Sequence, residues 1–86
     1  MQQIVNTFAQ VDFSRLQFPI IVIYNSPSDF RGYYVARIWD MKKPTNTIMI
    51  KKKLSQIRED IKNTLPNMVR FERKKFDDKV IVETWI

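Results

Sequence analysis

Hydrophobic side chains form several strand-like patterns along the chain, interrupted by one helical stripe. Residues 19–24 are a continuous apolar run rich in β-branched side chains, which predicts a strand buried on both faces near the centre of a sheet. Residues 33–40 alternate in the way that is typical of a second strand, and residues 47–50 predict a short third one after a polar turn. Residues 68–72 and 79–86 alternate again and predict a final hairpin.

The strongest single pattern predicts a helix over about residues 52–65. Its apolar positions are spaced i, i+3, i+7 and i+11, which places them in one stripe along the helix: Leu54, Ile57, Ile61 and Leu65. Pro66 ends the pattern, because the residue before a proline is disfavoured in the helical conformation. Lys51, Lys52 and Lys53 place positive charge at the positive end of the helix dipole, so the helix starts without a favourable cap.

The N-terminal segment is open to two interpretations. Ile4, Phe8 and Val11 are spaced i, i+4 and i+7, which suits one face of a short helix over residues 1–13. Val11 and Phe13 would equally suit the start of a strand.

These elements predict a single α+β domain over residues 1–86. The expected order is (α)-β-β-β-α-β-β, an antiparallel sheet of four to five strands with the helix at about 52–65 on one face. One helix covers only one side of such a sheet, yet the strands carry apolar side chains on both sides. Either residues 1–13 fold over the second face as a lid, or a partner chain covers it.

Composition narrows the range of chemistry. The chain has no cysteine, no histidine and one glycine, which argues against disulfides, thiolate or imidazole catalysis and glycine-rich phosphate loops. The remaining candidates for catalysis are the carboxylates of Asp77, Asp78 and nearby Glu83, but neighbouring residues of a strand point to opposite faces and would not share a site. We therefore expect no enzyme activity, no catalytic residue, no metal and no small-molecule cofactor.

Charge and hydropathy suggest where the protein works. The sequence shows neither a transmembrane run nor a signal peptide, so we expect a cytoplasmic protein without membrane contact. The net charge is +6, and all of the excess lies in residues 41–86, with twelve basic and six acidic residues. The bias towards Lys, Ile and Asn favours a low-GC bacterial or phage source.

Two sets of residues are candidates for contact sites. Tyr33, Arg37 and Trp39 share one face of the second strand, an arrangement typical of a protein hot spot or a base-stacking platform, unless they are core residues. Trp85 on the last strand is the fourth candidate for partner binding. The nucleic-acid candidates are the lysines of the acid-free stretch 41–53, unless that stretch is simply a solvated surface: Lys42, Lys43, Lys51, Lys52 and Lys53.

One resemblance concerns the order of elements. Residues 32–40, a following short strand, and Lys53-Leu54-Ser55-Gln56-Ile57 opening a helix resemble the β-β-β-α-β core of HicB-type antitoxins over about 35 residues. The chain departs from that family at Asp40-Met41-Lys42-Lys43-Pro44, and Lys53 stands where the family has a capping Thr or Ser. The resemblance implies an antitoxin of a toxin–antitoxin pair.

The sequence therefore predicts a small regulatory or accessory binding module that acts through protein contact. The partner is a different protein or a second copy of the chain, and a dimer is the expected working state. The alternatives are a nucleic-acid-binding protein that uses the lysines of residues 41–53, and a HicB-like antitoxin.

Overall fold

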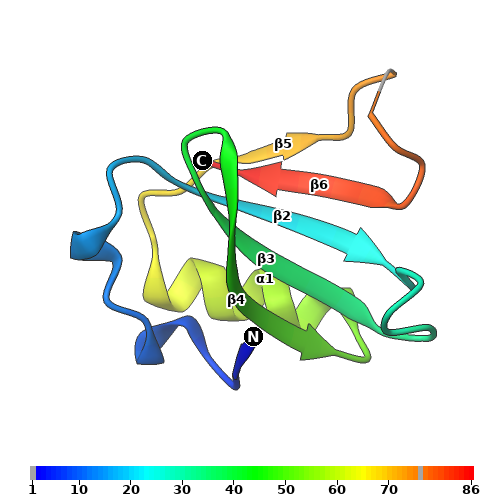
Figure 1. Cartoon of the computed structure of the whole chain (residues 1–86), viewed down its shortest axis with the longest axis horizontal. Coiled ribbons are helices and arrows are strands. Elements are labelled where there is room, and N and C mark those ends of the chain that lie inside the picture. Colours follow the sequence, from blue (N-terminus) through cyan, green and yellow to red (C-terminus); the bar gives the residue numbers. More distant parts are fainter. Residues whose placement is uncertain (1, 76) are drawn as a thin grey trace.

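The computed structural model describes residues 2–75 and 77–86 and has one helix packed on one face of a six-stranded sheet (Figure 1). The sheet order is β1-β4-β3-β2-β6-β5. The strands are β1 (Gln3–Val5), β2 (Pro19–Asn25), β3 (Tyr34–Asp40), β4 (Lys43–Lys51), β5 (Arg70–Glu72) and β6 (Ile81–Trp85). The α+β class is therefore confirmed.

Two details of the expected sheet were wrong. The sheet has six strands instead of four or five, and it is mixed, because β1 pairs in parallel with β4 while the other neighbouring strands of the described residues pair antiparallel. Residues 43–46, expected to form most of a turn, belong to β4, so that the loop between β3 and β4 is only Met41 and Lys42. Pro44 is tolerated there because that end of β4 pairs with β3 alone.

The predicted helix is α1 (Leu54–Thr64), close to the expected bounds. Ile57 and Ile61 are fully buried, and the outer members of the stripe, Leu54 and Leu65, are partly buried against the same core. The N-cap residue Lys53 makes no side-chain capping bond, as its chemistry predicts.

The N-terminal segment is not the expected α-helix. It consists of β1 and two 3-10 turns, η1 (Phe8–Gln10) and η2 (Phe13–Arg15). Phe8 is fully buried in the core beside Ile57 and Ile61, and its amide donates to Asp60 Oδ2 of α1 at 2.8 Å. The segment thus completes the core on the helix side of the sheet.

The two faces of the sheet therefore differ sharply. On the helix face, Ile21 and Ile23 of β2 pack with Ala36 and Ile38 of β3. Their neighbours along both strands point to the opposite side, here named the outer face, where neither α1 nor residues 5–16 lie. The expectation that residues 1–13 form a lid over the second face is thus not met by this arrangement.

Candidate contact surface on the outer sheet face

Cross-strand pairing builds the outer face from apolar side chains. Ile20 lies opposite Trp39, Val22 opposite Arg37, and Tyr24 opposite Val35. The continuous apolar run of β2 explains this arrangement, because a strand without alternation presents apolar side chains to both sides.

Arg37 and Trp39 both belong to this face, and only Arg37 is fixed there by a hydrogen bond of its side chain. The guanidinium of Arg37 donates from Nη1 to the carbonyl oxygen of Thr45 at 2.8 Å, at the point where the β3–β4 register shifts. Thr45 Oγ1 in turn donates to the carbonyl of Ile38 at 2.6 Å. Trp39 is half-buried, and within the described residues its Nε1 is buried without a hydrogen-bond partner. Both predicted residues therefore shape the outer face, and Arg37 is committed to the backbone.

The outer face is hollowed where the β3–β4 hairpin approaches β2 and β6. The central hollow has a volume of about 350 Å³, and Lys42, Asp77 and Thr84 are the polar residues on its wall. Its apolar lining comes from β2, β3, β6 and the hairpin loop: Ile20, Val22, Trp39, Met41 and Ile81, with Tyr24 at one end. Apolar concavities with few polar groups are typical binding sites.

Two further hollows share residues with the central one. Tyr24 also lines a hollow of about 190 Å³ that is walled by the loop residues Pro27 and Phe30. Asp77 and Thr84 also line one of about 360 Å³ beside Phe71 of β5. The three hollows are thus neighbours on the outer face, and together they are here named the outer trough, which extends across the sheet from β3 to β5.

The rim of the outer trough carries large apolar side chains that face solvent. Met41 is 53% exposed and Phe71 is 51% exposed. Met41 also has φ +58, a left-handed conformation that costs a residue with a Cβ roughly 1–2 kcal/mol. A bulky apolar residue thus occupies the first position of a two-residue hairpin loop, where glycine is preferred.

Tyr33 and Trp85 lie away from the outer trough. Tyr33 ends the loop before β3, is 37% exposed, and has Lys52 Nζ at 5.9 Å from its ring centroid. Trp85 is 4% exposed and belongs to the core on the helix face, because it pairs with Ile21. Trp85, the fourth candidate for partner binding, therefore does not share a face with Trp39.

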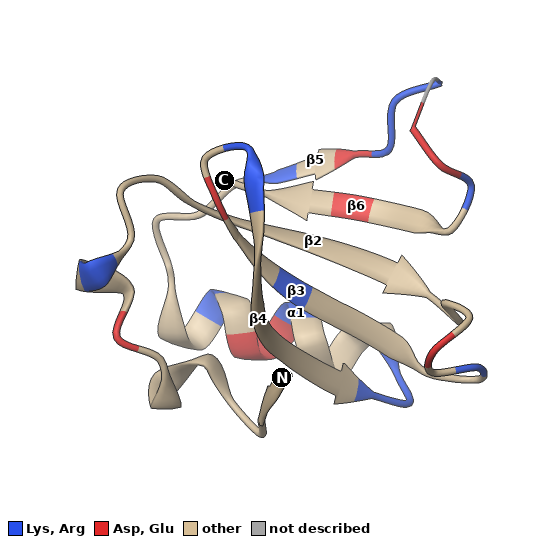
Figure 2. Ribbon diagram, in the orientation of Figure 1, with Lys and Arg blue, Asp and Glu red and all other residues tan. Residues whose placement is uncertain are grey.

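The lysine cluster of residues 41–53 is divided between two places. Lys42 and Lys43 lie at the tip of the β3–β4 hairpin, whereas Lys51, Lys52 and Lys53 lie at the other end of β4, before α1 (Figure 2). Lys43 and Lys51 are the first and last residues of the nine-residue strand β4, so a rise of roughly 26 Å separates the two groups. The five lysines therefore do not form one patch.

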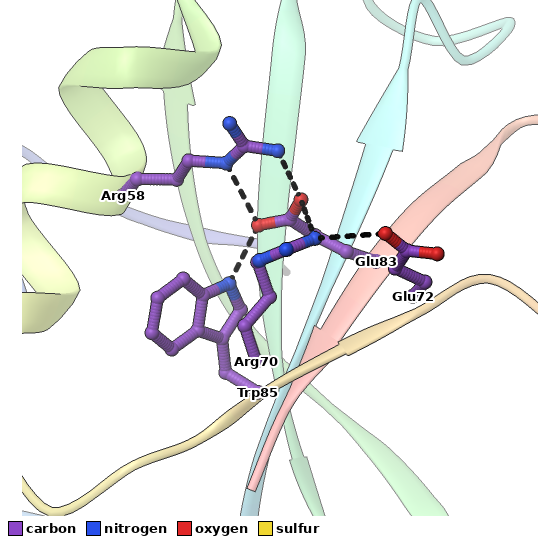
Figure 3. A network of polar contacts seen from close by, with 5 residues as sticks. All are labelled: Arg58, Arg70, Glu72, Glu83 and Trp85. Atoms are coloured by element: carbon purple, nitrogen blue, oxygen red, sulfur yellow. Dashed lines mark hydrogen bonds and ion pairs between the residues drawn. The ribbon is translucent and has the colours of Figure 1, made fainter.

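A buried polar network lies on the helix face (Figure 3). Glu83 of β6 is 1% exposed and accepts from Arg58 Nη2 at 2.6 Å, from Arg58 Nε at 3.1 Å and from Trp85 Nε1 at 2.8 Å. Arg70 Nη1 lies 3.8 Å from Glu83 Oε1 and 3.9 Å from Glu72 Oε1. The network ties α1 to β6 and β5.

The network favours the ionised form of Glu83. Burial raises the pKa of this carboxyl, but the hydrogen bonds from Arg58 and Trp85 and the nearby Arg70 charge outweigh burial and hold the pKa below its usual range. The bond to Glu83 likewise raises the pKa of Arg58, against the opposing effect of burial. Two charges locked together in this way hold the helix to the sheet.

The carboxylates of Asp77 and Asp78 accept hydrogen bonds from backbone amides of their own loop. Asp77 accepts from the amide of Lys74 at 2.9 Å, and Asp78 accepts from the amide of Val80 at 3.1 Å. Among residues 2–75 and 77–86, no three metal-ligating side chains gather into a candidate metal site. No helix within the described ranges is long and apolar enough to cross a membrane.

The comparisons with family models, curated proteins and solved structures find no match for this chain.

The sequence indicated part of the outer trough and missed the rest. Arg37 and Trp39 were identified because they alternate with the core residues of β3. The sequence did not predict that Tyr24, Ile81 and Phe71 line the trough. Their places there depend on the pairing of β6 with β2 and of β5 with β6. Met41 gave a local signal: a large apolar residue inside a two-residue turn between strands.

Proposed function

We propose that the protein is a small, non-enzymatic regulatory or accessory module of the cytoplasm that binds a protein partner on the outer trough. The observation that carries this proposal is that the face without a helix is both apolar and hollowed. A wet sheet face in an antiparallel sheet is usually polar. The strand side chains on this face are buried or half-buried, and the exposed apolar side chains are those of Met41 and Phe71 at the rim. Large exposed apolar side chains grouped beside a hollow usually mark a contact site.

The placement of the N-terminal segment supports an external partner over an internal lid. Residues 5–16 provide Val5, Phe8, Val11, Phe13 and Leu16 to the helix-side core. They are therefore committed to that side, and covering the outer trough with them would empty part of the core. A separate chain can cover the trough without such a loss.

The rim residues resemble an energetic hot spot. Met41 and Phe71 project beside a depression that already contains Tyr24 and Trp39. Large side chains next to a hollow supply most of the binding energy in many interfaces. Met41 also holds a strained backbone conformation, and such strain collects at functional sites.

Capture of a partner with matched variants tests the proposal. The affinity-tagged full chain is expressed in its native host as wild type, Met41→Glu and Phe18→Glu, and co-purifying protein is quantified against the bait. Phe18 is the control, because its side chain is 49% exposed and lines the groove beside the end of α1 but none of the three hollows, although its carbonyl accepts a hydrogen bond from the Met41 amide at 2.9 Å. We expect a partner near equal stoichiometry with wild type and Phe18→Glu, and its loss with Met41→Glu.

Two results would contradict the proposal. One is a partner that Phe18→Glu removes and Met41→Glu retains, which would place the contact at the groove beside α1. The other is no stoichiometric protein with any bait, together with a strict monomer in sedimentation at high micromolar concentration.

Binding of nucleic acid through Lys42, Lys43 and the lysines at 51–53 stays a prediction. If it occurs, affinity falls steeply with salt, because binding releases counterions from the phosphates. Replacing Lys51, Lys52 and Lys53 by Gln then weakens binding and flattens the salt slope. The absence of any gel shift in low salt, on single- and double-stranded probes, would end this alternative.

The HicB-like antitoxin and the dimer also stay predictions. The chain order β2-β3-β4-α1-β5 contains the β-β-β-α-β succession on which the antitoxin resemblance rests. For an antitoxin, the captured partner is a toxin; for a dimer, it is a second copy of the chain.

A further inference from the structure

The charge around the outer trough identifies the kind of partner, given the proposed function. We propose that the trough binds a short acidic peptide segment with at least two bulky apolar side chains, presented by a different protein. The apolar side chains occupy the central hollow and the hollow beside Phe71, and the acidic residues face the lysine-rich rim.

Basic side chains outnumber acidic ones at the rim of the central hollow and of the hollow beside Phe71. Two segments flank these hollows, the hairpin tip at residues 41–43 and the loop residues 73–75 and 77–80. Together they carry six basic side chains and two acidic ones, and Glu72, which lines the hollow beside Phe71 and lies 3.9 Å from Arg70, is a third acid next to them. The basic residues are Lys42, Lys43, Arg73, Lys74, Lys75 and Lys79.

The basic side chains of the rim and the acidic side chains of its loop differ in their contacts. Each of these six basic residues is exposed, and none forms an ion pair within residues 2–75 and 77–86. Asp77 and Asp78, by contrast, accept hydrogen bonds from backbone amides of their own loop. An approaching chain therefore meets a positive rim, which attracts acidic segments and repels basic ones.

The basic rim disfavours a second copy of this chain as the partner on the trough. A face-to-face dimer through the trough would bring two such lysine-rich rims together across a two-fold axis. Like charges placed opposite one another oppose association, and this chain already carries a net charge of +6. The rim thus favours a partner of opposite charge.

Nucleic acid is also negatively charged, but the lining of the central hollow suits it less well than an apolar side chain. The central hollow is lined mainly by apolar side chains, and the carboxylate of Asp77 lies on the wall it shares with the hollow beside Phe71. That carboxylate opposes phosphate and acidic peptide alike, so the feature that separates them is the apolar lining, which offers few groups to hydrogen-bond base edges. Leucine, isoleucine or phenylalanine side chains suit such a lining better.

The dimensions fit a short segment. The trough crosses the sheet from β3 through β2 and β6 to β5, and neighbouring strands lie roughly 5 Å apart. The span is therefore roughly 15 Å, which an extended peptide covers with about five residues.

Fluorescence anisotropy with designed peptides tests the inference on the full chain. The probe is a labelled peptide of alternating Glu and Leu. Its controls have Lys in place of every Glu, or Ser in place of every Leu, and a labelled single-stranded oligonucleotide is a fourth probe. We expect the Glu–Leu peptide to bind at least about tenfold more tightly than either control peptide and to weaken as salt rises.

Matched variants locate the binding. Lys42→Glu reverses a charge at the rim, and Lys62→Glu makes the same change on exposed Lys62 of α1, on the helix side of the sheet. We expect Lys42→Glu to weaken the Glu–Leu peptide roughly tenfold, and Lys62→Glu to change its affinity less than about twofold.

Each remaining outcome overturns the inference. These outcomes are equal affinity for the Glu–Leu and Lys–Leu peptides, no binding of any peptide at high micromolar protein, equal effects of the two variants, or an oligonucleotide that binds more tightly and displaces the peptide. Self-association that Met41→Glu abolishes would assign the trough to a second copy. The proposed function fails separately: a captured protein that contacts the trough through a basic or neutral segment overturns only the acidic peptide.

Discussion

Arg37 donates a hydrogen bond from Nη1 to the carbonyl oxygen of Thr45 across the irregular part of the β3–β4 ladder. The register there passes from the pair Arg37–Ile48 to the pair Trp39–Pro44, so β4 contains extra residues at this point. Such bulges bend a strand, and Figure 1 shows β4 turning along its length. The bend lets Met41 and Lys42 line the same hollow as Ile81 of β6.

Replacing Arg37 by Met is expected to destabilise the protein by about 1–2 kcal/mol. The change removes a charged donor from a part-buried carbonyl and keeps most of the apolar stem. Denaturant unfolding measures the effect, and Arg31→Met, at an exposed loop position, is the control. Equal small effects of the two changes would mean that the bond to Thr45 does not hold the bulge.

Met41→Gly is expected to stabilise the fold by about 0.5–1 kcal/mol, because it removes the left-handed strain at the hairpin loop. The same change removes an apolar side chain from the rim, so affinity for the partner falls. Thermal unfolding and peptide anisotropy on the same preparation measure the two effects. A loss of stability, or unchanged affinity, would contradict the assignment of Met41 to the contact surface.

Ile61→Ala is expected to cost about 2–4 kcal/mol, because it leaves a cavity between α1 and the sheet where Ile61 is fully buried. Val69→Ala, at a side chain that is 57% exposed, should change the unfolding free energy by less than about 0.5 kcal/mol. An effect below about 0.5 kcal/mol at Ile61 in a denaturant melt would contradict the described core.

The ion pair of Glu83 and Arg58 makes stability depend on pH. The pKa of Glu83 is lowered in the folded protein, so the stability that its ionised form supplies is complete above the unfolded pKa of about 4.3. It is lost as the pH falls through the lower folded value. Glu83→Gln should remove this dependence and cost about 2–4 kcal/mol at neutral pH, since it weakens a charged hydrogen bond at a buried site.

Urea unfolding of wild type and Glu83→Gln, across the acid range and at pH 7, checks this prediction. The control is Glu72→Gln, because Glu72 is exposed and its contact with Arg70 is long, with 3.9 Å between Glu72 Oε1 and Arg70 Nη1. Parallel pH profiles for wild type and Glu83→Gln would contradict the role assigned to the buried carboxylate.

The sequence predicted those parts of the fold that are set locally. The stripe of Ile57 and Ile61 gave the helix and its buried face, and the apolar run of β2 gave a strand with two apolar faces. Residues 33–40 alternated as predicted, with Ala36 and Ile38 in the core. In each case the periodicity of the side chains determines which face is buried.

The remainder depends on pairing between distant segments. Nothing within Gln3–Val5 specifies a parallel strand, because the direction of pairing is set by β4, more than forty residues away along the chain. The face that Trp85 occupies is fixed by its pairing with Ile21 and by the register shift between Ile23 and Tyr24. Glu83 faces the core only because Arg58 and Trp85 satisfy its carboxylate there.

Amide hydrogen exchange of the protein alone and in complex with the captured partner tests the central proposal most directly. The proposal predicts new protection concentrated at the outer trough, in residues 20–24, 39–43, 71–75 and 77–84, with little change in α1. Protection confined to α1, or to the groove formed by residues 17–19 and 64–68 together with Ile86, would contradict it.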